Sequence, residues 1–215
     1  MIDLYKYENE LRDNGIHVIA GVDEVGRGPL VGSVITACVV LPSDFALEGL
    51  TDSKKLSEKK RDKFYDIILE QSLAVGIGEC TEKEIDQFNI YEATKIAMKR
   101  AIEQASKKIA IEHILIDAMP LDIDIPTTSI IKGDAKSISI AAASVIAKVT
   151  RDRMMYELDK IYPMYDFKHN KGYPTKKHRD SIAKYGITKY HRLSYKPVFK
   201  YKDKINEIDK NFFQK

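Results

Sequence analysis

The chain has 215 residues, and 44% of them are hydrophobic, which is enough to fill the core of one ample domain or two small ones. Lys and Arg number 35 against 32 Asp and Glu, so the formal net charge is only +3. These values exclude disordered, collagen-like and coiled-coil proteins.

The cysteine content and the absence of long apolar runs indicate where the protein works. Cys38 and Cys80 lie far apart without a CxxC pattern, so we expect two buried thiols in strands rather than a disulfide or a zinc site. Such usage is typical of a reducing compartment. No apolar run reaches the roughly 20 residues that cross a bilayer. We therefore expect a soluble, cytoplasmic protein without a membrane partner.

The first half of the chain predicts a hairpin followed by helix and strand. Apolar alternation predicts a strand over residues 16–24, and a second apolar run covers residues 31–41. The short, glycine-containing segment 25–30 between them predicts antiparallel pairing. Residues 43–56 have the polar character of a loop, Ser57 is expected to cap a helix that ends near residue 71, and residues 73–80 alternate as a third strand.

The second half alternates helices with strands. Apolar residues at spacings of three and four predict a helix around residues 97–105. Two short strands are predicted at 112–117 and 127–131, and a long helix at 137–162. This order favours an α/β fold with a mixed five-stranded central sheet flanked by helices. We expect a core over residues 1–163 and a basic, mostly helical C-terminal part, 164–215, docked on it as one structural domain.

The small net charge hides an uneven distribution. Residues 168–204 contain twelve Lys and Arg against two acids, a net of +10, so the rest of the chain sums to −7. Tyrosine and phenylalanine side chains alternate with these cations. A charged run can be simply a solvated face, but this combination is also typical of a surface that binds a polyanion such as nucleic acid.

Four acids stand where predicted strands end, which is where α/β proteins collect functional groups. Asp23 and Glu24 close the first strand, Asp117 closes the strand at 112–117, and Asp134 follows the last strand. A salt-bridged turn would explain the first pair, and a helix N-cap would explain Asp134. Asp117 has no such structural explanation, since apolar neighbours draw it toward the interior.

Carboxylates without a cysteine or histidine ligand pattern favour hard cations. We therefore expect Mg²⁺ or Mn²⁺ rather than zinc. Two such ions can activate a water and stabilise the leaving oxygen in phosphodiester cleavage. The acids and the basic stretch together suggest a nuclease.

Several motifs, in order along the chain, resemble one known family, bacterial ribonuclease HII. Residues 21–30 read GVDEVGRGPL, residues 52–57 read DSKKLS, and residues 116–119 read IDAM. They are followed by KGDAKS at 132–137, AAASVIAK at 141–148, Arg151-Asp152, and KGYPTK at 171–176 with His178. The similarity runs from about residue 16 to residue 195.

The resemblance implies a ribonuclease-H-like fold and an endonuclease that hydrolyses the RNA strand of RNA/DNA hybrids. It also implies nicking on the 5′ side of single ribonucleotides in duplex DNA, which leaves 3′-hydroxyl and 5′-phosphate ends and serves ribonucleotide removal. Two divalent ions, Mn²⁺ or Mg²⁺, are the implied cofactors. The expected partners are RNA/DNA hybrids and ribonucleotide-containing DNA, and the expected state is a monomer.

The resemblance also assigns residues. The implied metal-binding, catalytic acids are Asp23, Glu24, Asp117 and Asp134. The loop that recognises the 2′-hydroxyl is implied to be Gly26, Arg27 and Gly28, with Tyr173 completing it. We further expect substrate contacts from Ser53, Lys54 and Lys148, while Lys55 is expected to be solvated. Arg151 could contact the duplex or pair with nearby acids.

Two rival functions remain on the sequence alone. A DNA-only nuclease or recombinase of similar fold would also use clustered acids, and a non-catalytic nucleic-acid-binding protein would use only the basic stretch. A nucleotide-binding enzyme is disfavoured, because neither GxGxxG nor GxxxxGK[ST] occurs.

The end of the chain offers a further motif. Phe212 and Phe213 suggest a sliding-clamp motif. Asp209 stands where that motif needs an aliphatic residue, so we instead expect an apolar helix end that packs on the domain.

Overall fold

The computed structural model describes residues 3–210, which form two compact units. Unit 1 consists of residues 3–25, 35–79 and 94–149, and unit 2 of residues 26–34, 80–93 and 150–210. The predicted division at residue 163 stays a prediction. Phe212 and Phe213 lie outside the described residues.

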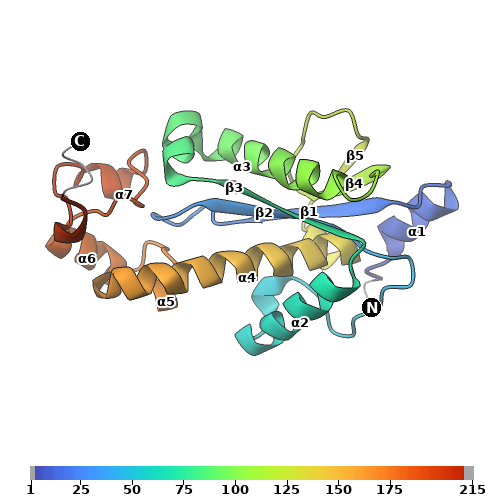
Figure 1. Cartoon of the computed structure of the whole chain (residues 1–215), viewed down its shortest axis with the longest axis horizontal. Helices are drawn as coiled ribbons and strands as arrows, with labels where there is room; N and C mark the ends of the chain where they lie inside the picture. Colours follow the sequence, from blue (N-terminus) through green and yellow to red (C-terminus); the bar gives the residue numbers. More distant parts are fainter. Residues whose placement is uncertain (1–2, 211–215) are drawn as a thin grey trace. The chain divides into compact units, whose positions relative to one another are not determined.

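Five strands form one mixed sheet in the order β3-β2-β1-β4-β5 (Figure 1). β1 pairs antiparallel with β2, and the parallel pairs are β1 with β4 and β4 with β5. Their bounds are β1 Ile19–Val25, β2 Val34–Val40, β3 Ala74–Cys80, β4 His113–Asp117 and β5 Thr127–Ile130. The fold class, the hairpin and all five predicted strands are thus confirmed.

The helices predicted up to residue 71, around 97–105 and at 137–162 are present, whereas the helix at 6–13 was not predicted and the C-terminal helices are short. Seven helices occur within residues 3–210. They are α1 Lys6–Asp13, α2 Glu58–Gln71, α3 Glu82–Ser106, α4 Ile138–Ile161, α5 Phe167–Asn170, α6 Lys176–Tyr185 and α7 Lys196–Phe199. Short 3-10 turns stand at η1 Ser53–Lys55, η2 Gly133–Ala135, η3 Pro163–Tyr165 and η4 Glu207–Asp209. Ser57 caps α2 as expected, its hydroxyl accepting from the Lys60 amide.

The sheet of unit 1 is covered by helices on both faces (Figure 1). Side chains from alternate positions of β1, such as Ala20 and Val22, pack against Met98 and Ala101 of α3. On the opposite face α4 comes so close that a Cβ on Gly21 would lie 2.1 Å from the backbone carbon of Ser139. Gly21 therefore allows α4 to lie directly on β1.

Unit 2 has its own core, in which aromatic and aliphatic side chains pack together. Tyr162, Tyr165 and Phe167 are buried there beside Ile182 and Val198. The rings of Tyr165 and Phe167 stack with centroids 5.2 Å apart. The basic C-terminal stretch thus folds around a packed aromatic centre rather than forming a free tail.

Two smaller expectations can also be compared with the structure. Cys38 and Cys80 are both free and buried, in β2 and β3, as predicted. None of the helices within residues 3–210 has both the length and the apolar character that crossing a membrane requires.

Candidate active site

Strand geometry brings Asp23 and Asp117 together on the α4 face of the sheet. The parallel register pairs Gly21 with Leu115 and Val22 with Ile116, so the next residue of each strand is an aspartate. Successive side chains alternate between faces, which places Asp23 on the face of Gly21. Asp23 is buried, while Asp117 is half-buried.

Asp134 reaches the same place from the turn before α4. Lys132 adopts the left-handed conformation, φ 58°. The following Gly133 amide donates to Asp117 Oδ1 at 2.7 Å. A Cβ on Gly133 would lie 2.6 Å from Ile140 Cδ1, so glycine suits this crowded turn. Asp134 therefore sits inside η2 and is not the N-cap of α4.

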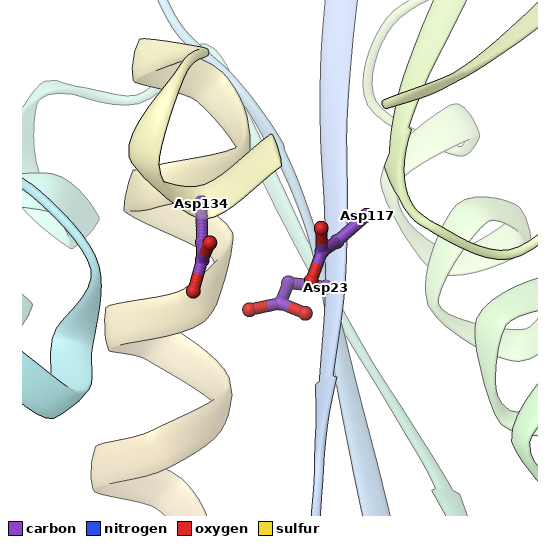
Figure 2. A group of neighbouring side chains, drawn as sticks. All are labelled: Asp23, Asp117 and Asp134. Carbon is purple, nitrogen blue, oxygen red and sulfur yellow. The ribbon is translucent and has the colours of Figure 1, made fainter. Parts of the chain in front are cut away.

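Asp23, Asp117 and Asp134, which we call the acid group, each offer a carboxylate oxygen within 4.8 Å of the others. Figure 2 shows their carboxylates converging from the sheet and from the turn before α4. Glu24, the fourth predicted acid, is not among these three. Its charge nevertheless acts on Asp23, and its amide donates to Asp23 Oδ1 at 2.7 Å.

The acid group concentrates negative charge in a poorly solvated place. Burial raises the pKa of Asp23 well above its ordinary value, and the charges of Glu24 and Asp117 raise it further. Burial also raises the pKa of Asp134, with Asp52 and Asp117 adding to it. Such repulsion is relieved when a cation binds between the carboxylates.

Lys54 supplies positive charge to these carboxylates. Burial lowers the pKa of its ammonium group, but Asp134, Asp23 and other nearby acids outweigh that effect, and the net shift is upward. The exposed Lys54 side chain is thus held in its charged form beside the acid group. Lys55 is exposed, as expected.

Two residues beside the acid group were missed by the sequence reasoning. The Ser144 hydroxyl hydrogen-bonds Asp23, and Ser144 Oγ also lies 2.8 Å from Ser53 Oγ. Ser53 is only 3% exposed, so it supports Asp23 through its contact with Ser144. The predicted contact of Ser53 with substrate stays a prediction. Asp52 hydrogen-bonds Asp134. In the sequence, only the position of Asp52 at the start of the DSKKLS motif points to a role for this residue.

The predicted recognition residues meet in unit 2. Arg27 and Gly28, in the segment after β1, are exposed, and Tyr173 is 41% exposed. A Cβ on Gly28 would lie 3.4 Å from Tyr173 Cε1, so the ring lies against this loop. Gly26 has φ +98°, a conformation that other residues rarely adopt. We call residues 26–28 the reading loop.

The remaining predicted contacts have different outcomes. Lys148 is half-buried on α4, and its role stays a prediction. Of the two alternatives left open for Arg151, contact with a duplex is not supported, because Arg151 is 1% exposed. Its guanidinium donates to three backbone carbonyls, those of Val31, Ser33 and Lys171.

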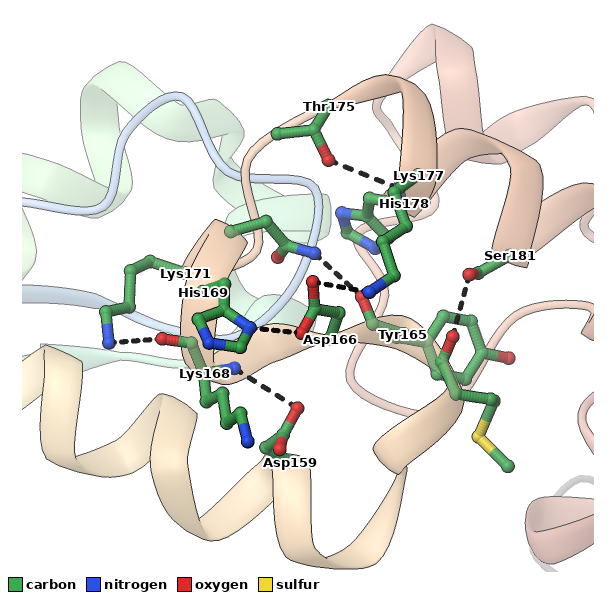
Figure 3. Close-up of polar contacts among 12 residues, drawn as sticks. Asp159, Tyr165, Asp166, Lys168, His169, Lys171, Thr175, Lys177, His178 and Ser181 are labelled. Carbon is green, nitrogen blue, oxygen red and sulfur yellow. Dashed lines mark hydrogen bonds and ion pairs between the residues drawn. The ribbon is translucent and has the colours of Figure 1, made fainter.

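Several cations of the basic stretch are held by contacts inside unit 2 (Figure 3). Asp166 accepts from Lys177 Nζ at 2.8 Å and lies 2.5 Å from His169 Nδ1. Although burial raises the pKa of Asp166, the hydrogen bonds from Lys177 and His169 lower it overall. These contacts join the start of α5 to the first turn of α6 and hold the Lys177 ammonium beside Asp166.

Comparison with known proteins agrees with this chemistry. The family model described as Ribonuclease HII matches residues 20–198. Ribonuclease HII of Bacillus cytotoxicus is 57% identical over 92% of this chain and 75% of its own length. The ribonuclease H2 crystal structure from Pyrococcus horikoshii matches with a TM-score of 0.70 at 25% identity, covering 92% of this chain and 99% of that one.

A second solved structure, Bst-RNase HIII in complex with Mn²⁺, has a TM-score of 0.64 at 18% identity and covers 86% of this chain and 68% of that one. The fold is therefore that of the type 2 ribonucleases H. Within that class the chain belongs to the ribonuclease HII family. It is an endoribonuclease that hydrolyses RNA paired with DNA.

Proposed function

We propose that this enzyme nicks duplex DNA on the 5′ side of a single embedded ribonucleotide, as well as cutting RNA in hybrids. The observation that carries the choice of a ribonucleotide is the ring of Tyr173 lying against the reading loop, 3.4 Å from where a Cβ on Gly28 would lie. The acid group, whose carboxylate oxygens lie within 4.8 Å of one another, supports the cleavage step. Cleavage there would leave 3′-hydroxyl and 5′-phosphate ends. The role of such an activity is the removal of ribonucleotides from DNA.

The acid group, with Glu24, would hold two Mn²⁺ or Mg²⁺ ions. Carboxylates without thiol or imidazole ligands fit such hard cations. Burial raises the pKa of Asp23, and the charges of Glu24 and Asp117, which a bound cation would offset, raise it further. When bound, these ions supply activation of the attacking water and stabilisation of the departing 3′ oxygen. The Gly133 amide and the Ser144 hydroxyl hold the carboxylates of Asp117 and Asp23 in orientation.

The reading loop and Tyr173 would supply specificity for ribose. The 2′-hydroxyl is the group that distinguishes RNA from DNA, and backbone amides can bind it only where the chain approaches the sugar closely. The exposed Gly28 permits that approach, and Tyr173 offers an exposed flat ring beside it. Support for this role comes from their adjacency within unit 2.

Cationic side chains would hold the phosphates of either strand. Lys54, Lys148 and the basic stretch 168–204 are the candidates for these contacts, which carry no sequence information. Monomeric state and cytoplasmic location also remain predictions.

Substitution of Asp117 by Asn tests the role of the acid group. Asp117→Asn removes a carboxylate charge from the group, so we expect the cleavage rate to fall by about 1000-fold or more, while affinity for the substrate is kept. Cleavage of a duplex carrying one ribonucleotide, with the product ends mapped, measures this. Asp124→Asn is a matched control, because Asp124 is an exposed acid of the same unit outside the acid group.

The same assay separates the proposal from its rivals. Full activity of Asp117→Asn would remove the acid group from the mechanism. Equal cutting of duplexes with and without the ribonucleotide would favour a DNA-only nuclease, and binding without any metal-dependent cutting would favour a non-catalytic protein.

A further inference from the structure

A buried arginine in unit 2 holds the reading loop from behind. Arg192 is 0% exposed, and its guanidinium donates to backbone carbonyls. Its Nη2 donates to Gly26 O at 2.6 Å, its Nη1 to Arg27 O at 3.1 Å, and its Nε to Gly32 O at 2.8 Å. Three carbonyls of one segment thus share a single charged donor group.

Tyr195 completes this arrangement. Its hydroxyl donates to Arg27 O at 2.5 Å and accepts from Arg192 Nη1 at 3.0 Å. The Arg27 carbonyl therefore receives two hydrogen bonds, one of them from a charged donor. Charge-assisted hydrogen bonds of this kind are the stronger ones, so this carbonyl has little freedom to turn.

Fixing these carbonyls also fixes the amides of the loop. In a trans peptide the carbonyl and the N–H point in opposite directions, and the structure contains no cis peptide among residues 3–210. The carbonyls of Gly26 and Arg27 belong to the same peptide groups as the amides of Arg27 and Gly28. When the carbonyls face Arg192 inside unit 2, these amides face away from it, and Arg27 and Gly28 are both exposed.

A glycine-flanked loop needs such restraint. Glycine gives Gly26 and Gly28 access to many backbone conformations, and an unrestrained loop would lose entropy on meeting a substrate. A loop held in advance binds without that cost. The restraint comes from a residue about 165 positions further along the chain, through bonds that only the folded unit forms.

We propose that Arg192, together with Tyr195, is a positioning residue for ribonucleotide recognition: it orients the amides of Arg27 and Gly28 toward the 2′-hydroxyl. This inference rests on the proposed function of the reading loop. It differs from a purely structural role because it couples Arg192 to discrimination between ribose and deoxyribose, beyond the stability of unit 2.

A pair of matched variants tests the proposal. Tyr195→Phe removes a hydroxyl that donates to Arg27 O and accepts from Arg192. Tyr165→Phe removes one with the same bonding pattern elsewhere in unit 2, since the Tyr165 hydroxyl donates to Gly186 O at 2.7 Å and accepts from Asn206 Nδ2 at 3.0 Å. Each variant loses one donated and one accepted hydrogen bond, but only Tyr195→Phe loosens the reading loop.

The measurement is the affinity ratio between two duplexes of one sequence, with and without a single ribonucleotide, without divalent ions so that neither is cut. We expect Tyr195→Phe to lower this ratio by about threefold to tenfold, and Arg192→Lys by more, because a Lys ammonium cannot span three carbonyls. Tyr165→Phe should keep the wild-type ratio. Urea unfolding of each variant identifies the folded ones.

The outcomes separate this proposal from the one it rests on. A wild-type ratio near one would mean that the reading loop does not recognise ribose, and the proposed function of the loop would fail. A clear wild-type preference that Tyr195→Phe retains in full would overturn the positioning role alone. If Arg192→Lys does not fold, the affinity ratio of Tyr195→Phe alone tests the positioning role.

Discussion

At the scale of single residues, two buried histidines show how hydrogen bonds fix a protonation state. His191 Nδ1 accepts from the Thr188 amide, so the proton of a neutral His191 ring lies on Nε2. His178 Nδ1 faces Tyr173 O at 2.9 Å and must carry a hydrogen there. The 3.2 Å contact between the two Nε2 atoms then runs from His191 to His178. The pair is satisfied when both rings are neutral.

This pair predicts a loss of stability in acid. Burial lowers the pKa of His178, and burial together with the charge of His178 lowers the pKa of His191 well below 6.5. Below pH 6.5 these two histidines therefore bind protons in the unfolded chain but stay neutral in the folded chain. The stabilisation is complete above that pH and falls as the pH drops, by about 1 kcal/mol between pH 6.5 and 5.5 for His191, whose pKa is the more strongly lowered, and by less for His178.

Urea unfolding across this pH range measures the effect. His191→Gln, which lacks one titrating ring, should show a shallower fall in unfolding free energy between pH 6.5 and 5.5, whatever its stability at pH 8. An identical slope in the variant and the wild type would show that His191 is not neutral in the folded protein.

The residues of the site differ in how far the sequence could reveal them. Acids at strand ends carry a local signal, and Asp23, Asp117 and Asp134 do converge. Ser144 has no such signal, because its role depends on a hydrogen bond to Asp23, which is far away in the sequence. In the sequence Arg192 lies among other cations, which predicts an exposed residue of a polyanion-binding surface. In the structure it is buried, and its guanidinium binds carbonyls about 165 positions away in the sequence.

At the scale of elements, the contact between β1 and α4 decides whether the acid group forms. Gly21→Ala would place a methyl group 2.1 Å from the Ser139 carbonyl carbon, inside the backbone of α4. The backbone of α4 cannot move aside as a flexible side chain could. We therefore expect the unfolding free energy to fall by at least about 3 kcal/mol. Cleavage should fall as well, because the turn carrying Asp134 leads directly into α4.

Urea unfolding measures the stability loss, and another glycine of the chain provides the comparison. In Gly28→Ala the new methyl would meet only Tyr173, at 3.4 Å, an ordinary contact distance. This variant should unfold at the wild-type urea concentration. Equal stability of Gly21→Ala and wild type would show that α4 does not rest on β1 as closely as described.

The elements that the sequence missed also have a physical explanation. α1 was not predicted, since its surface is strongly charged and no capping side chain marks its start. Its attachment instead depends on Glu8, which is 1% exposed and accepts from the Ser137 hydroxyl and the Ser139 amide. Asn89, with φ 65° inside α3, breaks a helix whose sequence shows no proline there.

At the scale of the whole molecule, the charge distribution sets how the protein meets a polyanion. A chain with net charge +3 would attract nucleic acid weakly if its charges were spread evenly. Here +10 lies in residues 168–204 and −7 in the rest, where the acid group concentrates carboxylates. Divalent ions bound to the acid group would reduce the repulsion of phosphates, so binding of metal and of substrate should support each other.

The salt dependence of binding tests the basic stretch. Lys200 and Lys202 are exposed, and their Nζ atoms lie over the rings of Tyr201 and Phe199. If each contacts one phosphate, Lys200→Gln with Lys202→Gln should reduce the slope of log affinity against log salt by about 1.8. The control is Lys107→Gln with Lys108→Gln, which removes the same charge at exposed positions following α3. Equal slopes for both double variants would mean that net charge, rather than the basic stretch, governs binding.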